Sequence, residues 1–194
     1  AATMPKVLGN VSSRPLLSRE ELLAESDIEG YGGIVLIGSH VKKTTQQLEE
    51  LKRAKVPAEF LEFHVDTCLC KGGLQAETAR VIEKAEAVMK QGRTAVVYTS
   101  RTLFAPEGMS TEEMLKLSVR ISAAVTGVIA GLHEKPRFLI AKGGITSSDV
   151  GTKALRVRKA LVLGQVQPGI PVWQTGEECK FQGLPYIIFP GNVG

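Results

Sequence analysis

The 194-residue sequence has few aromatic residues, no long apolar run and little net charge. Aromatic residues make up 5% of the chain, and the formal net charge is +4. The basic residues are scattered through the predicted helices and are not interleaved with aromatics, which argues against a nucleic-acid-binding surface. No apolar stretch looks long enough to span a bilayer, so we expect no membrane role. A mild positive charge remains suitable for a small anionic ligand.

The chain has three cysteines, and its beginning lacks a basic segment followed by an apolar signal core. An odd number of cysteines in a chain of this size is not typical of a disulfide framework. We therefore expect a cytoplasmic protein. Residues 1–17 mix proline, glycine and small hydroxyl residues, which predicts a linker or a vector-derived segment, so that residues 18–194 would form one domain.

The familiar nucleotide-binding signatures are also missing. No G-x-x-x-x-G-K-[ST] occurs, and the order of Gly151-Thr-Lys is wrong for that motif. Gly30-Tyr-Gly-Gly precedes a predicted strand, whereas a dinucleotide-binding loop follows one. A Walker-type ATPase and a Rossmann dehydrogenase both lose support.

What the chain does contain is a regular alternation of apolar runs with segments of helical periodicity. Short β-rich runs bounded by glycine predict strands that are buried on both faces. The alternation predicts an α/β fold of three layers, with a mostly parallel sheet and helices on both of its faces. We expect strands at residues 33–38, 60–65, 94–98, 138–140, 160–163 and 186–189, and helices at 18–26, 42–54, 75–90, 111–132 and 147–155.

Small, polar or cationic residues follow the predicted strands. Ligands of open α/β sheets bind beyond the carboxyl ends of the strands, so these loops would form one surface. Loops favour small polar residues for backbone reasons alone, but five such loops together favour an anion site. They are Gly38-Ser39-His40, Thr99-Ser100-Arg101, Lys142-Gly143-Gly144, Gly164-Gln165 and Pro190-Gly191-Asn192.

Residues 138–153, F-L-I-A-K-G-G-I-T-S-S-D-V-G-T-K, form the most informative of these segments. Two glycines allow close approach of a ligand, and the start of the following helix offers unpaired N–H groups to a phosphate. Hydroxyls at residues 146–148 and the ammonium groups of Lys142 and Lys153 could add donors. A structural alternative is a capping box, in which Thr146 caps the helix and Asp149 reaches back to its backbone. The two interpretations are compatible, because a cap uses only some of the free N–H groups.

A weaker hypothesis concerns metal binding. In an extended chain, alternating residues point to one face, so His64, Asp66, Cys68 and Cys70 could together bind zinc. No second cluster supplies closing ligands, and strand alternation produces such patterns readily. We therefore assign no metal-ligating residues.

Five blocks of the sequence resemble, in order, a known family. They are I-V-L-I-G-S-H-V-K-K-T-T-Q-Q-L at 34–48, V-V-Y-T-S-R at 96–101, I-A-K-G-G-I-T-S-S-D-V at 140–150, L-G-Q-V-Q-P-G-I-P-V-W at 163–173 and G-L-P-Y-I-I-F-P-G-N-V-G at 183–194. They resemble the nucleotide-binding C-terminal domain of the four-carbon acid sugar kinases, which include the 3-oxo-tetronate kinases. Five ordered blocks are much more specific than one motif.

The resemblance implies ATP-dependent phosphorylation of the terminal hydroxyl of a four-carbon sugar acid, with ATP held by this domain. We expect the ATP to be bound together with Mg2+. Ser100 and Arg101 are weaker candidates for ATP contact. Many family members have an acid after the glycine pair, where this chain has Ile145, which leaves open whether Asp149 binds the metal. With Lys142 added from its place in the loop, the expected ATP-binding residues are Ser39, Lys142, Gly143, Gly144, Ile145, Thr146, Ser147, Gly191 and Asn192.

The family's Asp-Asp-x-Thr-Gly motif, which resembles a substrate and catalytic site, does not occur here. We therefore expect this chain to be one domain of a kinase that binds ATP without turnover, with the sugar acid bound by a separate N-terminal domain. The catalytic residues are unknown, and the long apolar helix at 111–132 could support a homo-oligomer. The alternative is a non-catalytic α/β module that binds a partner or an anion.

Overall fold

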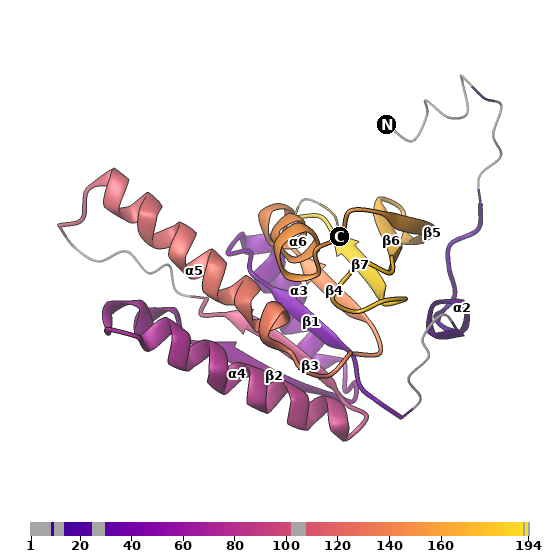
Figure 1. Ribbon diagram of the computed structural model, residues 1–194, viewed down its shortest axis with the longest axis horizontal. Coiled ribbons are helices and arrows are strands. Elements are labelled where there is room, and N and C mark those ends of the chain that lie inside the picture. The colour runs from indigo at the N-terminus through magenta and orange to yellow at the C-terminus, as the bar shows by residue number, and fades with distance from the viewer. Residues whose placement is uncertain (1–8, 10–13, 25–29, 102–107, 192, 194) are drawn as a thin grey trace.

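The computed structural model describes residues 9, 14–24, 30–101, 108–191 and 193 (Figure 1). Its strands form one seven-stranded sheet in the order β2-β3-β1-β4-β7-β6-β5. The first five strands in this order run parallel, and the last two pairings are antiparallel. The strands are β1 (Ile34–Ile37), β2 (Ala58–Phe63), β3 (Thr94–Thr99), β4 (Leu139–Lys142), β5 (Ala160–Gln167), β6 (Ile170–Thr175) and β7 (Pro185–Phe189).

Helices cover both faces of the sheet, which confirms the predicted three-layer α/β fold (Figure 1). One face packs against α4 (Gly73–Lys90), α5 (Thr111–Gly131) and α6 (Gly144–Asp149), the last of which continues as a π-helix, η2 (Val150–Ala154). The other face packs against α3 (Lys42–Arg53) at β1 and β3, and against α2 (Arg19–Ala24) at β6 and β7.

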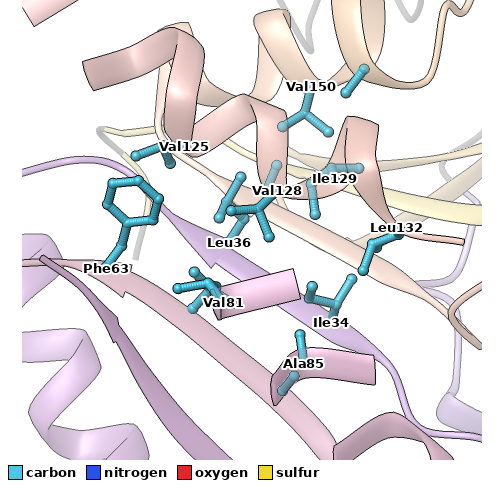
Figure 2. Close-up of a cluster of buried hydrophobic side chains, with 14 of the residues drawn as sticks. Ile34, Leu36, Phe63, Val81, Ala85, Val125, Val128, Ile129, Leu132 and Val150 are labelled. Carbon is cyan, nitrogen blue, oxygen red and sulfur yellow. The ribbon is translucent and has the colours of Figure 1, made fainter. Parts of the chain in front are cut away.

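The main core lies between the sheet and the pair α4 and α5 (Figure 2). All four residues of β1 are buried, as expected of a parallel strand that is covered on both faces. Ile34 and Leu36 point toward α4 and α5, while their neighbours Val35 and Ile37 pack with Leu48 of α3. The continuous apolar run of β1 therefore supplies both layers of the core.

The strand assignments at the C-terminal end of the chain were incomplete. The residues between the strands expected at 160–163 and 186–189 contain a further strand, β6, and β5 continues to Gln167, four residues beyond its predicted end. Pro168 and Gly169 form the two-residue turn of an antiparallel hairpin, with Gly169 at φ +81°. Pro and Gly occur in turns and loops of any length, so the residue types alone do not predict a two-residue turn here.

The segment from His64 to Cys70 is not extended. Residues Val65–Leu69 form a 3₁₀ helix, η1, so the alternation that would align His64, Asp66, Cys68 and Cys70 on one face does not occur. Within the described ranges, no group of three or more His, Cys, Asp or Glu side chains could hold a metal ion. The zinc hypothesis therefore has no structural support.

Helix α5 corrects the expectation that no stretch is long and apolar enough to span a bilayer. It has 21 residues and an 18-residue window with a mean hydropathy of 1.4. The buried side of the helix packs in the main core through residues such as Val125, Val128 and Ile129 (Figure 2). These contacts place α5 as a core helix of the α/β domain. Only 28% of the window is buried, so much of the apolar surface of α5 faces outward.

A buried carboxylate joins α4 to the end of β2. Glu77 is 5% exposed and accepts hydrogen bonds from the backbone N–H of His64 at 2.7 Å and from Nε and Nη2 of Arg80 at 2.7 and 2.6 Å. Arg80 Nη2 also donates to the carbonyl of Glu62 at 2.7 Å. Burial acts to raise the pKa of Glu77, but the hydrogen bonds from Arg80 and His64 outweigh it, and the pKa lies below its usual value.

The segment that leads into α2 is attached to the sheet edge. Ser18 and Glu21 form a reciprocal capping box, as their spacing predicts, with bonds of 2.7 and 3.1 Å. Leu17 donates its amide to the carbonyl of Gln165 in β5 at 2.8 Å. The side chain of Leu17 lies against Gly164, where a Cβ would come within 3.1 Å of it. The packed body of the protein therefore begins no later than Leu17.

Candidate functional site

The sheet has a topological switch point between β1 and β4. These two strands are parallel neighbours, with Ile37 opposite Lys142 at their carboxyl ends. The chain leaves β1 toward α3 on one face of the sheet and leaves β4 toward α6 on the other. Connections that diverge in this way open a crevice, which is where ligands of open α/β sheets bind.

Three glycine-containing loops meet at this crevice. A Cβ on Gly38 would lie 2.3 Å from Oγ1 of Thr146, and one on Gly143 would lie 3.3 Å from Cβ of Ser39. A Cβ on Gly191 would lie 3.7 Å from the amide nitrogen of Gly144. The loops after β1, β4 and β7 are therefore in contact. The sequence predicted that five strand-end loops form one surface, and these three do so.

The other predicted site residues have different positions. Gly164 and Gln165 lie inside β5 and pair with β6, because that strand is longer than predicted. Asn192 lies outside the described residues. Ser100 points its hydroxyl toward the carbonyl of Phe63 at 3.3 Å, at the end of β2. Gly164 and Gln165 therefore belong to the hairpin, and the hydroxyl of Ser100 is directed to β2.

Helix α6 begins without the predicted capping box. Gly143, at φ +122°, lets the helix begin at Gly144, only two residues after the end of β4, and no side chain caps it. Thr146 is consequently the third residue of the helix, and Asp149 forms an ion pair with Lys153 at 2.8 Å. The prediction of a cap at Thr146 was wrong, because a glycine pair allows an earlier start than side-chain capping preferences indicate.

The hydroxyls predicted to face a ligand differ in their availability. Ser147 is buried, and its Oγ donates to the carbonyl of Gly143 at 2.7 Å, which steadies the first turn of α6. Tyr186 donates its phenol to the carbonyl of Ser147 at 2.5 Å, and burial raises the pKa of that phenol. By contrast, Ile145 is 75% exposed and Gly144 is exposed, so the outer surface of this turn is open to a ligand.

Lys142 supports the loop that carries Gly191. Its side chain is 4% exposed, and its Nζ donates to the carbonyls of Pro190 and Val193, both at 2.9 Å. The ammonium also lies 3.9 Å from the centre of the Phe189 ring. Burial lowers the pKa of Lys142, and the nearby charge of Lys43 lowers it further. An ammonium has three N–H donors, so one donor remains beyond these two bonds.

We expect Lys142→Met to lower the melting temperature by ~2–6 °C, because two partly buried carbonyls lose their donor while the apolar stem is kept. Differential scanning calorimetry measures the change. Lys153→Met is the matched control, since that lysine is 69% exposed and makes a surface ion pair, whose removal has little effect. Equal melting temperatures for Lys142→Met and the wild type would show that the loop does not depend on Lys142.

Arg101 ties the ends of β1 and β3 together. Its Nη1 donates to the carbonyl of Ser39 at 2.7 Å, and its Nε and Nη2 donate to the carbonyl and hydroxyl of Thr99 at 2.8 and 2.6 Å. The guanidinium thus fixes the Ser39 backbone beside Gly143. Burial and the charge of Arg101 lower the pKa of His40, the residue that follows Ser39.

Helix α3 adds a second uncapped start to the crevice. No side chain caps it, its first turn holds no acid, and it begins with Lys42 and Lys43. Cations in a first turn oppose the helix dipole, so their presence favours a role other than helix stability. Together with α6, this helix directs free N–H groups and positive charge toward the β1–β4 crevice. The sequence had indicated Ser39 in this loop but not the two lysines.

A cleft of about 590 Å³ adjoins the crevice. Its walls are the outward side of α5 and the side of α6 and η2 that carries Ile145, Asp149 and Lys153, and its floor includes Gly38 and Thr99. The sequence did not indicate the α5 residues, because their periodicity is the same as that of a core helix. They include Met114, Leu115, Ser118, Val119, Ser122 and Thr126.

Comparison with known proteins gives a family and a fold. A family model described as the nucleotide-binding C-terminal domain matches residues 34–194. A candidate tRNA synthase from Salmonella typhimurium LT2 is similar in structure, with a TM-score of 0.56, 20% identity, and coverage of 90% of this chain and 41% of that protein. No curated protein matches the sequence significantly.

A second solved structure has the same fold. It is a domain of unknown function from Bordetella bronchiseptica, solved with bound citrate as a domain-swapped dimer. The TM-score is 0.55 at 16% identity, and the match covers 86% of this chain and 37% of that protein. This chain therefore spans about two fifths of the length of both proteins.

Proposed function

Because the chain belongs to the family of nucleotide-binding C-terminal domains, we propose that it holds Mg-ATP in the β1–β4 crevice for a sugar-acid kinase. The kinase would phosphorylate the terminal hydroxyl of a four-carbon sugar acid in the cytoplasm. The ordered sequence blocks that resemble the four-carbon acid sugar kinases support this finer assignment.

The contact of three glycine-containing loops carries the proposal. A side chain on Gly38 or Gly143 would press on a neighbouring loop, and one on Gly191 would occupy the space beside the amide of Gly144. The uncapped starts of α3 and α6 supply N–H donors, and Lys43 supplies positive charge. Backbone donors at helix starts, with space for close approach, are the usual means of binding phosphate.

Magnesium fits this arrangement as a partner of the phosphates. Mg2+ is commonly held by phosphate oxygens, water and one or two carboxylates, and it neutralises charge during phosphoryl transfer. Asp149 is the one carboxylate among the described residues that line the cleft, and it is paired with Lys153. We therefore propose Asp149 as the candidate protein ligand.

The remaining part of the reaction would come from another domain. Phosphoryl transfer depends mostly on positioning and charge neutralisation, so a domain that only holds ATP would bind without turnover. The two solved proteins of similar fold are more than twice as long as this chain. Their additional length supports the proposal that a further domain presents the acceptor hydroxyl.

Isothermal titration calorimetry with ATP and Mg2+ tests the proposal. We expect binding with a dissociation constant of ~1 mM or tighter, competition by ADP, and no ATP hydrolysis or transfer by this chain alone. No heat and no competition at millimolar nucleotide would reject it. The alternative, a non-catalytic anion-binding module, predicts that inorganic phosphate competes as well as ADP does.

A further inference from the structure

Thr126 has a buried hydroxyl without a hydrogen-bond partner. The residue is 5% exposed, and its Oγ1 is one of the buried polar atoms that bond to nothing in the described part of the structure. An unsatisfied buried hydroxyl costs ~1–3 kcal/mol, so one in a stable fold needs an explanation.

Three other hydroxyls in the described helices bond to the backbone of the preceding turn. Thr78 and Thr152 donate to the carbonyl four residues earlier, both at 2.8 Å, and Ser118 donates to the carbonyl three residues earlier. Such bonds are the usual way in which a helical threonine satisfies its hydroxyl. Thr126 does not make this bond, so its hydroxyl remains available for a group outside the helix.

Thr126 lines the cleft between α5 and α6. The two helices converge where the C-terminal half of α5 packs on η2, and they separate toward the start of α5 (Figure 1). Thr126 is buried near the point of convergence, whereas Leu115 and Val119 are 64% and 61% exposed nearer the open end. The hydroxyl is therefore a polar group at the closed end of a mainly apolar cleft.

The cleft is continuous with the glycine crevice. Thr146 lines the cleft, and its Oγ1 is the atom nearest to a Cβ on Gly38, at the mouth of the crevice. A ligand whose phosphates lie at the glycine loops can therefore extend into the cleft past Thr146. The volume and the mixture of apolar walls with a few polar groups are those of a small-molecule site.

Building on the function proposed above, we propose that the α5–α6 cleft takes the nucleoside part of the nucleotide and that the Thr126 hydroxyl hydrogen-bonds to it. A planar base matches the apolar side chains of α5 and Ile145, and its edge offers both donors and acceptors to a hydroxyl. A small sugar acid fits less well, because its hydroxyls and carboxylate would lose water against these apolar walls. Thr126 is thus a binding residue for the nucleoside, distinct from the phosphate loops.

Thr126→Val tests the role of the hydroxyl, since valine keeps the shape of the side chain. We expect the dissociation constant for Mg-ADP to rise ~5- to 10-fold, while binding of magnesium pyrophosphate, which lacks the nucleoside, stays the same. The melting temperature should be equal to or above that of the wild type, because an unpaired buried hydroxyl is removed. Thr152→Val is the matched control, and we expect it to leave ADP affinity unchanged.

Ser122→Leu tests the location independently, because Ser122 is half-buried and its enlarged side chain would fill the cleft. We expect it to weaken ADP binding at least 10-fold and to leave pyrophosphate binding intact, with melting curves recorded for both variants. Unchanged ADP affinity in both folded variants, or equal losses for ADP and pyrophosphate, would overturn the nucleoside assignment. A wild-type protein that binds neither ADP nor ATP would instead reject the proposed function itself.

Discussion

Gly144→Val should weaken Mg-ATP binding at least ~100-fold while leaving the protein folded. Gly144 is exposed, and a Cβ added there meets nothing within 4 Å, so the fold has room for the side chain. Gly144 is the first residue of α6, and the helix propensities of glycine and valine differ by only a few tenths of a kcal/mol. The added methyl groups would occupy the space in which the phosphates must approach the N–H groups of the first turn. Calorimetric titration measures the loss.

The control for this variant is Ser148→Val. Ser148 is exposed on the same helix, one turn further on, and is absent from the residues that line the cleft. We expect it to bind Mg-ATP like the wild type. If Gly144→Val keeps both its melting temperature and its affinity, the glycine pair has only a structural role, and the site lies elsewhere.

Glu77→Ala should lower the free energy of unfolding by about 2–4 kcal/mol at pH 7. The substitution leaves the His64 N–H without its acceptor and the Arg80 guanidinium without its carboxylate. Removing one partner of a buried ion pair is costly because it strands the other charge, and the partial exposure of Arg80 moderates the loss. Urea denaturation measures it. Glu49→Ala, which breaks a surface pair with Lys52, should change the stability by less than ~0.5 kcal/mol.

The effect of Glu77→Ala should depend on pH. The pKa of Glu77 in the folded protein lies below its value of about 4.3 in the unfolded chain, so its stabilising contribution is complete above that value. The contribution is lost as the pH falls through the lower, folded-state pKa. The difference between wild type and Glu77→Ala should therefore shrink below about pH 4. A difference that stays constant from pH 7 to pH 3 would show that the ionised carboxylate is not the source.

The sequence predicted the parallel half of the fold well, because buried parallel strands produce continuous apolar runs. Residues 33–38 are an example, since β1 lies within them and all of its residues are buried. The hairpin of β5 and β6 was harder to predict, because Pro168 and Gly169 indicate a turn without indicating its length. Antiparallel pairing at the edge of a parallel sheet is decided by tertiary contacts, which local residue preferences do not contain.

The candidate site was predictable in outline but not in detail. Strand-end loops placed Ser39, Gly143, Gly144 and Gly191 together, because parallel strands share one carboxyl edge. Lys142 shows what the sequence could not predict. Its place at the end of a strand does not indicate that its ammonium bonds to two carbonyls some 50 residues later. Thr126 lies within an apolar helix, and only the absence of its usual backbone bond distinguishes it from a core residue.

The bond from Leu17 to β5 has a consequence for the edge of the sheet. β5 is one of the two edge strands of the sheet, and its Leu161 and Val162 are 62% and 60% exposed. A polypeptide that begins at Ile34, where the family match starts, would leave the carbonyl of Gln165 and the surface at Gly164 uncovered. Uncovered apolar edge strands pair with other copies and aggregate. The segment before α2 therefore covers part of this edge at Gly164 and Gln165, and we expect a polypeptide that starts at Ile34 to be more prone to edge-to-edge pairing.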